Sequence, residues 1–277
     1  MLQPNELWSA WEFDPGIVIP LVLSATLYAA GSRKRNRTAT VRERPFPRLC
    51  FWLGWTSLVL ALLSPLHPLG EVLFSAHMVQ HEILMLISAP LLVLSRPLVT
   101  FLCAFPINIR RHLGQWSKRR YVRRTWLFLT GAFTAWSLHA AAIWVWHFPP
   151  LFDLTVESDL VHTAQHLSFL LSALLFWWAL FYAHGRKSYG AGVLYVFTTA
   201  VHTGILGALL TFAPHIWYAP YRNTTQAWGL TPLQDQQIGG LVMWVPASLV
   251  YIAAGLALFA AWLKESDALL ERASLAK

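Results

Sequence analysis

The sequence predicts an all-α polytopic membrane protein with seven transmembrane helices, its N-terminus outside the cell and its C-terminus in the cytoplasm. Hydrophobic residues make up 56% of the 277 residues and charged residues only 12%, a balance far from that of a soluble globular domain. Seven apolar stretches approach the roughly 20 residues that cross about 30 Å of hydrocarbon. We therefore expect a single transmembrane helical-bundle domain over residues 1–277.

The seven expected spans cover residues 17–32, 49–66, 72–95, 125–147, 159–183, 190–212 and 238–263. The first is the shortest of them. No Lys or Arg precedes Arg33, and three acidic residues come before the first stretch. Because a cleaved signal peptide begins with a positively charged segment, we expect the first stretch to be a true span.

The positions of the basic residues predict the orientation. Lys and Arg in short loops are retained on the cytoplasmic side of a membrane. Of the 21 basic residues, 20 fall in the connections 33–48 and 96–124, after the fifth span, or in the C-terminal tail, and only Arg222 falls on the opposite side. Topology and attraction to anionic membrane lipid account for the net charge of +8, so we expect no nucleic-acid partner.

Two motifs of the form His-x-x-Gln-His lie just inside the third and fifth expected spans. The first contains His77 and His81, and the second contains His162 and His166. Residues four apart on a helix share one face, so both rings of a pair can reach one ion. At about 1.5 Å of rise per residue, the two pairs lie at similar depths near the outer face. Ionisable groups in hydrocarbon usually face the bundle interior, so the motifs predict a shared metal site.

The other histidines are weaker candidates. His139 reaches a similar depth and His202 lies near the middle of the bilayer, so either could contribute to the metal site or form an ordinary interhelical hydrogen bond. We expect the remaining five to be loop or interfacial residues: His67, His112, His147, His184 and His215.

Methionine and acidic residues near this layer extend the set of candidate ligands. Met78 and Met243 carry thioethers, which together with imidazoles suit copper, especially Cu(I), although methionine also commonly fills gaps in a core. Glu82 follows the first motif directly and could bind metal, orient an imidazole or pair across the bundle. Asp235 is a weaker candidate that we expect to cap the seventh span, where Gly239 would allow close helix contact. The two cysteines form no Cys-x-x-Cys pair, so a thiolate site has no support.

Three segments carry a resemblance to a known family. They are the first histidine motif followed by Ser-Ala-Pro-Leu-Leu at 88–92, the second motif leading into Phe-Trp-Trp at 176–178, and Asp-Gln at 235–236 followed by Gly-Gly at 239–240 and Met-Trp-Val-Pro at 243–246. At these residues the chain resembles the CtaG family of cytochrome c oxidase assembly proteins, the multispanning kind associated with caa-type oxidases. The resemblance covers about residues 50–262.

The resemblance implies a bacterial plasma-membrane protein that assists the maturation of a haem–copper oxidase. The family's motif histidines correspond to His77, His81, His162 and His166, and its acidic motif position corresponds to Asp235. Copper would be bound in the outer leaflet and delivered to oxidase subunits, with a copper donor protein as a further partner. Glu82 and Arg96 stand where apolar or small residues would be expected, which distinguishes this chain from the family pattern.

We expect a metal-binding and transfer protein rather than an enzyme. A b-type haem cytochrome is the first alternative, but axial ligation needs one imidazole on each haem face, which two neighbours on one helix cannot supply. A metal-dependent membrane hydrolase with Glu82 as general base is the second. The His-Glu-x-x-His motif of such enzymes is absent, because Glu82 follows the second histidine.

Overall fold

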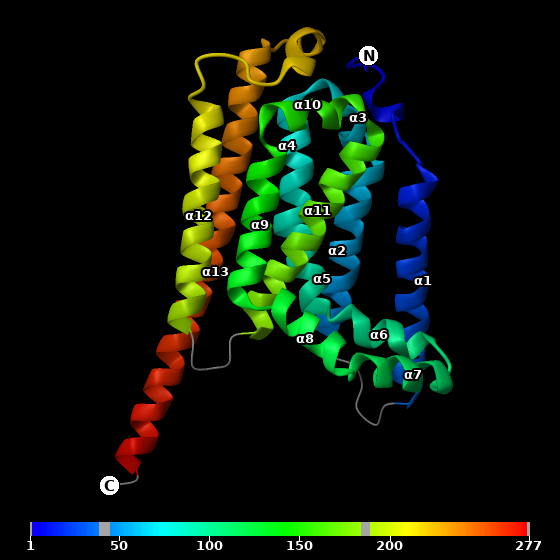
Figure 1. Cartoon of the computed structure of the whole chain (residues 1–277), viewed down its shortest axis with the longest axis vertical. Coiled ribbons are helices and arrows are strands. Elements are labelled where there is room, and N and C mark those ends of the chain that lie inside the picture. The colour runs from blue at the N-terminus through cyan, green and yellow to red at the C-terminus, as the bar shows by residue number, and fades with distance from the viewer. Residues whose placement is uncertain (1, 39–44, 184–188, 276–277) are drawn as a thin grey trace.

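The computed structural model describes residues 2–38, 45–183 and 189–275, and these residues form helices and loops without a β-strand. Most of the long helices run side by side along the longest axis of the molecule (Figure 1). Six helical segments are long and apolar enough to cross a membrane: Pro15–Asn36, Pro45–Leu63, Phe74–Ser95, Asp159–Tyr182, Tyr189–Thr211 and Pro232–Ser266. They belong to α1 (Pro15–Thr38), α2 (Pro45–Leu63), α4 (Phe74–Glu82) to α5 (Ala89–Ser95), α11 (Asp159–Trp178) with η3 (Ala179–Ala183), α12 (Tyr189–Thr211) and α13 (Pro232–Leu275).

The fourth expected span, residues 125–147, contains a break in its helix. Residues 120–146 form two helices, α8 (Arg120–Leu129) and α9 (Ala132–Trp146), bent by 60° at the break between them. Gly131 precedes α9 as its N-cap residue, and its extended backbone separates α9 from α8. The described chain therefore has six candidate spans, or seven if the bent pair counts as one.

The third span contains a π-helical segment. It is built from α4 (Phe74–Glu82), the π-helical η2 (Ile83–Ser88) and α5 (Ala89–Ser95). A π-helical segment disrupts the regular α-helical ladder and leaves carbonyls that need other donors. The indole of Trp177 donates to the Met85 carbonyl at 2.8 Å, so α11 (Asp159–Trp178) satisfies one of these carbonyls. A second π-helical segment, η3 (Ala179–Ala183), follows α11.

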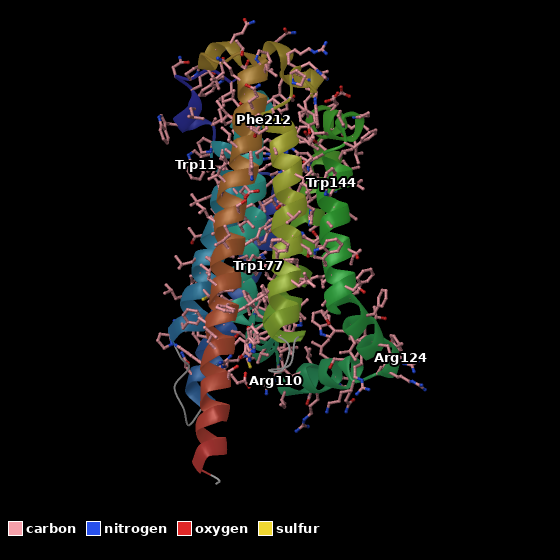
Figure 2. The ribbon with its side chains drawn as sticks, turned by 90° about the vertical axis from the view of Figure 1, so that its left-hand side faces the viewer. Trp11, Arg110, Arg124, Trp144, Trp177 and Phe212 are labelled. Atoms are coloured by element: carbon pink, nitrogen blue, oxygen red, sulfur yellow. The ribbon has the colours of Figure 1, made fainter. Side chains whose placement is uncertain are left out.

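Short helices lie at both ends of the bundle. At the end that carries the N-terminus are η1 (Leu7–Ser9), α3 (Leu66–Val72), α10 (Pro149–Glu157), η4 (Ala219–Asn223) and η5 (Gln226–Trp228) (Figure 1). At the opposite end are α6 (Pro97–Ala104), α7 (Ile107–Ser117) and α8. Figure 2 shows Arg110 and Arg124 at this second end, far from Trp11 and Phe212.

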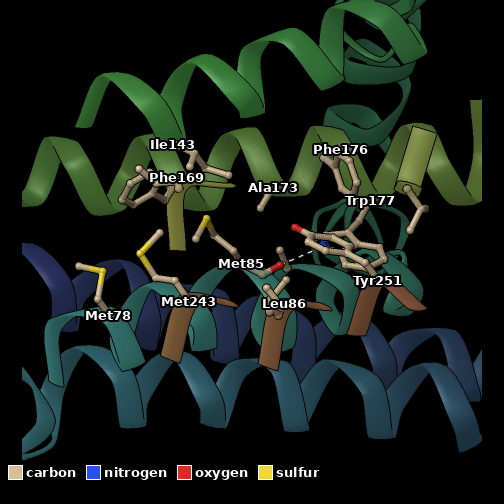
Figure 3. Packing of buried hydrophobic residues seen from close by; sticks show 14 of the residues in the cluster. Met78, Met85, Leu86, Ile143, Phe169, Ala173, Phe176, Trp177, Met243 and Tyr251 are labelled. Carbon is tan, nitrogen blue, oxygen red and sulfur yellow. Dashed lines mark hydrogen bonds between the residues drawn. The ribbon is translucent and has the colours of Figure 1, made fainter. Parts of the chain in front are cut away.

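Small residues allow α13 to approach its neighbours closely. A Cβ atom added at Gly240 would lie 2.6 Å from the Thr211 nitrogen of α12, and one at Gly239 would lie 2.3 Å from the Phe74 ring of α4. The expected close helix contact at Gly239 is therefore confirmed. Met78, Met85 and Met243 lie in a buried apolar cluster with Phe169, Phe176 and Trp177 (Figure 3).

Candidate metal centre

The two histidine motifs meet between α4 and α11. The rings of His77 and His162 stack with centroids 4.8 Å apart, and those of His81 and His166 are 5.2 Å apart. All four side chains are buried. The spacing of four residues places each pair on one helix face, and the packing of the two helices turns these faces toward each other.

Two more histidines join this cluster, and for them the expectation of a loop or interfacial position was incomplete. The ring of His67, from the short helix α3, lies 5.1 Å from that of His162, and the ring of His147, just after α9, lies 5.9 Å from that of His81. His67 does fall between two apolar stretches, and His147 is the last residue of the fourth expected span. However, α3 folds back onto α4, and His147 is buried beneath the loops that cover this end.

Gly70 explains how α3 comes close enough to α4 to bring His67 into the cluster. A Cβ atom at this position would lie 2.6 Å from the Gln80 side-chain oxygen and 3.3 Å from the His77 Cα atom. A larger residue would therefore push α3 away from α4. The sequence signal for His67 is weak, since it consists only of a histidine three residues before a glycine.

The glutamine of each motif binds a histidine on another element. Gln80 lies 3.1 Å from the Nδ1 atom of His67 and donates to the Ala61 carbonyl at 2.8 Å. Gln165 lies 3.0 Å from the Nε2 atom of His77. The pattern His-x-x-Gln-His thus supplies two imidazoles and one amide that hydrogen-bonds to an imidazole of another segment. Such hydrogen bonds fix the orientation of histidine rings in metal sites.

His81 and His147 have ring nitrogens without hydrogen-bond partners in the part of the chain that the structure describes. The His81 side chain is fully buried, and neither of its ring nitrogens has a hydrogen-bond partner among the described residues. His147 binds the Ile143 carbonyl through Nδ1 at 2.7 Å, so Nδ1 carries the hydrogen and the unpartnered Nε2 has a free lone pair. A buried polar group left unsatisfied costs about 1–3 kcal/mol, which a bound cation would offset.

The histidines form two groups that could each hold a metal ion. His77, His81 and His166 make up the first, which we call the inner group, and His67, His162 and His166 make up the second, the outer group. Within each group the ligand atoms lie within 4.8 Å of one another. Metal–nitrogen bonds of about 2 Å would need these atoms to close by roughly 1 Å.

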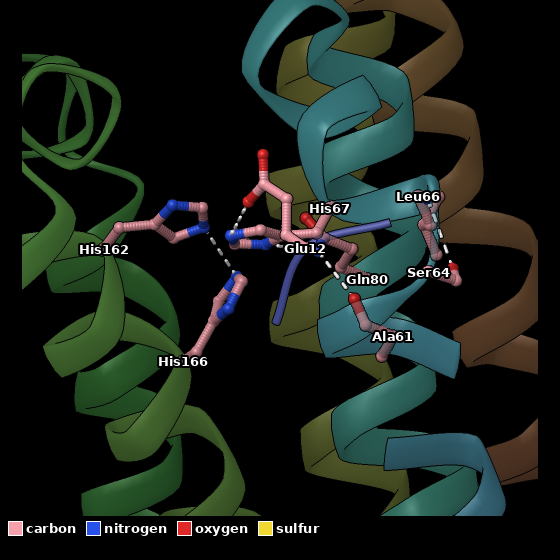
Figure 4. Close-up of polar contacts among 8 residues, drawn as sticks. All are labelled: Glu12, Ala61, Ser64, Leu66, His67, Gln80, His162 and His166. Carbon is pink, nitrogen blue, oxygen red and sulfur yellow. Dashed lines mark hydrogen bonds and ion pairs between the residues drawn. The ribbon is translucent and has the colours of Figure 1, made fainter. Parts of the chain in front are cut away.

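A cavity of about 670 Å³ reaches the outer group. His67, His162 and His166 line it together with Glu12, Asp14, Glu71 and Asp159, and mostly apolar residues of α1, α2, η2 and α11 line the rest. Glu12 lies 3.6 Å from the Nε2 atom of His67, and Figure 4 shows this contact beside the His162–His166 pair, whose Nε2 atoms are 3.1 Å apart. Glu12, His67 and Glu71 could themselves hold a cation.

Burial and charge act in opposite directions on His67 and in the same direction on Glu71. Burial lowers the pKa of His67 below its usual 6.5, although Glu12, Asp159 and Asp14 oppose this effect. Burial raises the pKa of Glu71, and the carboxylates of Glu12 and Asp159 raise it further. His67 is therefore largely a neutral imidazole at pH 7, the form that binds metal.

The loop between α12 and α13 covers the cluster. The Tyr221 hydroxyl donates to the Gly70 carbonyl at 2.8 Å and lies 3.2 Å from the Nδ1 atom of His77. The Tyr218 hydroxyl donates to the His147 carbonyl at 3.0 Å, and that of Thr224 donates to the Val72 carbonyl at 2.7 Å. Three side chains of one loop thus fix the segments that carry three of the histidines.

Asp235 caps a different helix from the one expected. Its carboxylate accepts hydrogen bonds from the Phe74 and Ser75 backbone nitrogens at 2.6 and 3.1 Å and from the Ser75 hydroxyl, so it caps the start of α4. Its own helix is capped by Thr231 and Gln234, each of which binds the backbone nitrogen of the other. Asp235 therefore holds the first motif's helix in place.

The other candidates lie outside both histidine groups. Met78 and Met243 face the apolar cluster, and the Oε2 atom of Glu82 is buried without a hydrogen-bond partner among the described residues. His139 binds the Ser172 hydroxyl at 3.1 Å, and His202 accepts a hydrogen bond from the Trp144 indole at 3.3 Å. Two of the expected loop histidines, His112 and His215, are exposed, and His184 lies outside the described residues.

Comparison with known families identifies the chain. Residues 26–265 match the family described as cytochrome c oxidase caa3 assembly factor, Caa3_CtaG. The chain belongs to this family. The resemblance drawn from the histidine and aspartate motifs is thus confirmed over most of the chain, and the family is one of assembly factors rather than of known enzymes.

Mycobacteria contain similar proteins. The chain is 29% identical over 265 residues to an uncharacterized protein of Mycobacterium tuberculosis and to one of Mycobacterium bovis, matches that cover 93% of this chain and 40% of each relative. It is also 29% identical over 276 residues to an uncharacterized protein of Mycobacterium leprae, covering 95% of this chain and 41% of that relative. The chain therefore spans about 40% of the length of these curated relatives. No solved structure gives a significant match.

Proposed function

We propose that this Caa3_CtaG protein binds Cu(I) with its buried histidines and delivers it to a cytochrome c oxidase during assembly of the enzyme. The family supports the oxidase as the destination. The observation that carries the binding proposal is the inner group, where three imidazoles meet and both nitrogens of His81 are buried without partners among the described residues.

The charge of the inner group favours a monovalent ion. His77, His81 and His166 are neutral ligands when they bind metal, and no carboxylate belongs to this group within the described residues. The cost of moving an ion out of water rises with the square of its charge, so burying Cu(I) costs about a quarter as much as burying a divalent ion. Since Met78 and Met243 lie in the apolar cluster, the preference for Cu(I) depends on this charge argument and on the family rather than on thioethers.

The location of the charges supports the orientation that we propose. The basic helices α7 and α8 lie at the end opposite the histidine cluster (Figure 1), which would put them at the cytoplasmic face and the histidines in the outer leaflet of a bacterial plasma membrane. The N-terminus would then be outside and the C-terminus inside, with the chain forming one transmembrane domain. Anionic lipid would bind α7 and α8.

The oxidase subunit and a copper donor protein would approach from the outer side. The loop over residues 212–231 covers the cluster there, and it contacts histidine-bearing segments through Tyr218 and Tyr221. We propose this loop as the docking site for the oxidase subunit, because movement of the loop would loosen His77 and His147.

The alternatives receive less support from the geometry. Stacking of His77 on His162 at 4.8 Å leaves no room for a macrocycle between these rings, so a small ion suits the histidine cluster better than haem. Glu82 belongs to neither histidine group among the described residues, which disfavours its use as a general base on metal-bound water.

Copper content and oxidase activity test the proposal together. His77→Ala and His162→Ala should each lower the affinity for Cu(I) at least about tenfold and reduce oxidase activity in the same cells, with normal amounts of the protein in the membrane. His139→Ala is the matched control, a buried histidine outside both groups, and should retain copper. Copper is measured by elemental analysis after removal of any histidine tag. Full copper content and oxidase activity in both variants would refute the assignment, and a Soret band in the purified protein would favour haem.

A further inference from the structure

We infer that the ion reaches the inner group through the outer group, with His67 as the first ligand on this path and His166 as the ligand shared by both positions. The inference rests on the proposed function and adds to it an acquisition site and a direction of transfer. Three observations support it: the cavity lining, the orientation of His67, and the position of His166.

The cavity gives access to the outer group. Its walls include His67, His162 and His166, whereas His77 and His81 are not part of the described lining. His81 is fully buried, and His77 is 1% exposed. An ion from the aqueous side would therefore meet the outer group before the inner one.

Acidic side chains line the same cavity next to His67. The lining includes four carboxylates, those of Glu12, Asp14, Glu71 and Asp159. Two of them, Glu12 and Glu71, lie close enough to His67 to hold a cation together with it. A cleft of one charge sign between apolar walls raises the local concentration of ions of the opposite sign. These carboxylates would concentrate cations beside the first imidazole.

His67 is oriented for this role. Gln80 lies against its Nδ1 atom, and the Nε2 atom faces Glu12 (Figure 4). Gln80 is fully buried, and its amide nitrogen donates both to Nδ1 and to the Ala61 carbonyl, so the ring is fixed with Nε2 toward Glu12. Nε2 then carries the hydrogen of the neutral ring, and an ion binds there once that hydrogen has moved to Nδ1. Its side chain is still 15% exposed, which makes it the most accessible member of the two groups.

His166 connects the two positions. Its ring centroid lies 4.2 Å from that of His162 in the outer group, and 5.2 and 5.5 Å from those of His81 and His77 in the inner group. An ion held by His166 would exchange His67 and His162 for His81 and His77. The ion keeps its charge throughout, so the transfer needs no electron. The ring hydrogen of His67 that moves when the ion binds returns when the ion leaves, so no net proton is taken up or released.

Two substitutions of similar shape at residue 67 test the path. Cu(I) is added to the metal-free protein, and loading and release to a Cu(I) chelator are timed by stopped flow. His67→Leu should slow loading at least about tenfold, whereas His67→Met should load close to the wild-type rate because a thioether also binds Cu(I). His81→Leu should load rapidly but release copper at least about tenfold faster, since only the outer position remains. His139→Leu should match the wild type in both rates.

Each outcome decides one claim. Loading at the wild-type rate by both residue 67 variants would remove the outer group from the path. Equally slow loading by both would mean that His67 has a structural role, which also overturns the inference, while normal equilibrium copper binding would leave the proposed function intact. If the wild-type protein binds no Cu(I), the proposed function fails as well.

Discussion

Replacement of His81 by leucine should stabilise the metal-free protein while it abolishes tight metal binding. Both ring nitrogens of His81 are enclosed without partners among the described residues, against Phe169 on one side and three other imidazoles on the others. An unsatisfied buried polar group costs about 1–3 kcal/mol, and a substitution that conserves volume costs less than about 1.5 kcal/mol. The expected net effect is a gain of about 1 kcal/mol in unfolding free energy.

Thermal unfolding in detergent, with and without Cu(I), measures both effects. Without metal, His81→Leu should unfold a few degrees Celsius above the wild type, at roughly 2–4 °C per kcal/mol. Free Cu(I) at about 100 times the dissociation constant should stabilise the wild type by about 2.7 kcal/mol and the variant far less. The order of stability should therefore reverse when copper is added.

His139→Leu is the control for this experiment. The ring of His139 is equally buried but binds the Ser172 hydroxyl, so its loss should cost about 0.5–1.5 kcal/mol with or without copper. If metal-free His81→Leu is destabilised as much as His139→Leu, or if copper stabilises it as much as the wild type, His81 is not an unsatisfied metal ligand and the reasoning is wrong.

Three further predictions concern the frame around the cluster. Asp235→Ala should lower the unfolding free energy by about 1–3 kcal/mol, because it removes the acceptor for the backbone nitrogens at the start of α4. Thermal unfolding or limited proteolysis would measure this loss. Stability equal to that of the wild type would contradict the capping role. Gly239→Ala should destabilise the protein by about 1–3 kcal/mol, since the added Cβ would lie 2.3 Å from the Phe74 ring. The control Gly255→Ala, whose added Cβ has nothing within 4 Å, should be neutral or slightly stabilising. Equal melting temperatures for the two variants would show that α13 can shift without cost. The third prediction concerns pH. Burial lowers the pKa of His67 in the folded protein below 6.5, so near and below pH 6.5 the unfolded chain binds more protons at this residue than the folded protein does. The unfolding free energy therefore falls as the pH drops through 6.5. Glu12→Gln removes a carboxylate that opposes this shift and should make the loss between pH 7 and 5 steeper. At pH 8 the variant should be at least as stable as the wild type, because its repulsion with Glu71 is removed. Parallel melting curves of the two proteins across this range would exclude the coupling.

The sequence alone determined the class of the molecule and the residues at its centre. Long apolar stretches are obliged to be helices in a membrane, since every backbone group must be satisfied within the segment. Their limits agree with six of the observed segments to within six residues at each end. The spacing of four residues determined that His77 and His81 share a face, as do His162 and His166. These are local properties, and helix geometry fixes them before any packing occurs.

The tertiary structure decided which faces meet and what lies between the helices. His67 and His147 had no helical spacing that linked them to the motifs, and only the return of α3 onto α4 and the burial of the segment after α9 brought them in. Likewise, Asp235 caps α4 because α13 packs beside it, and Met78 faces α13 because it lies about 100° around the helix from His77. Such contacts join residues up to 161 positions apart, and they depend on the packing of whole helix surfaces, which no local pattern of residues encodes.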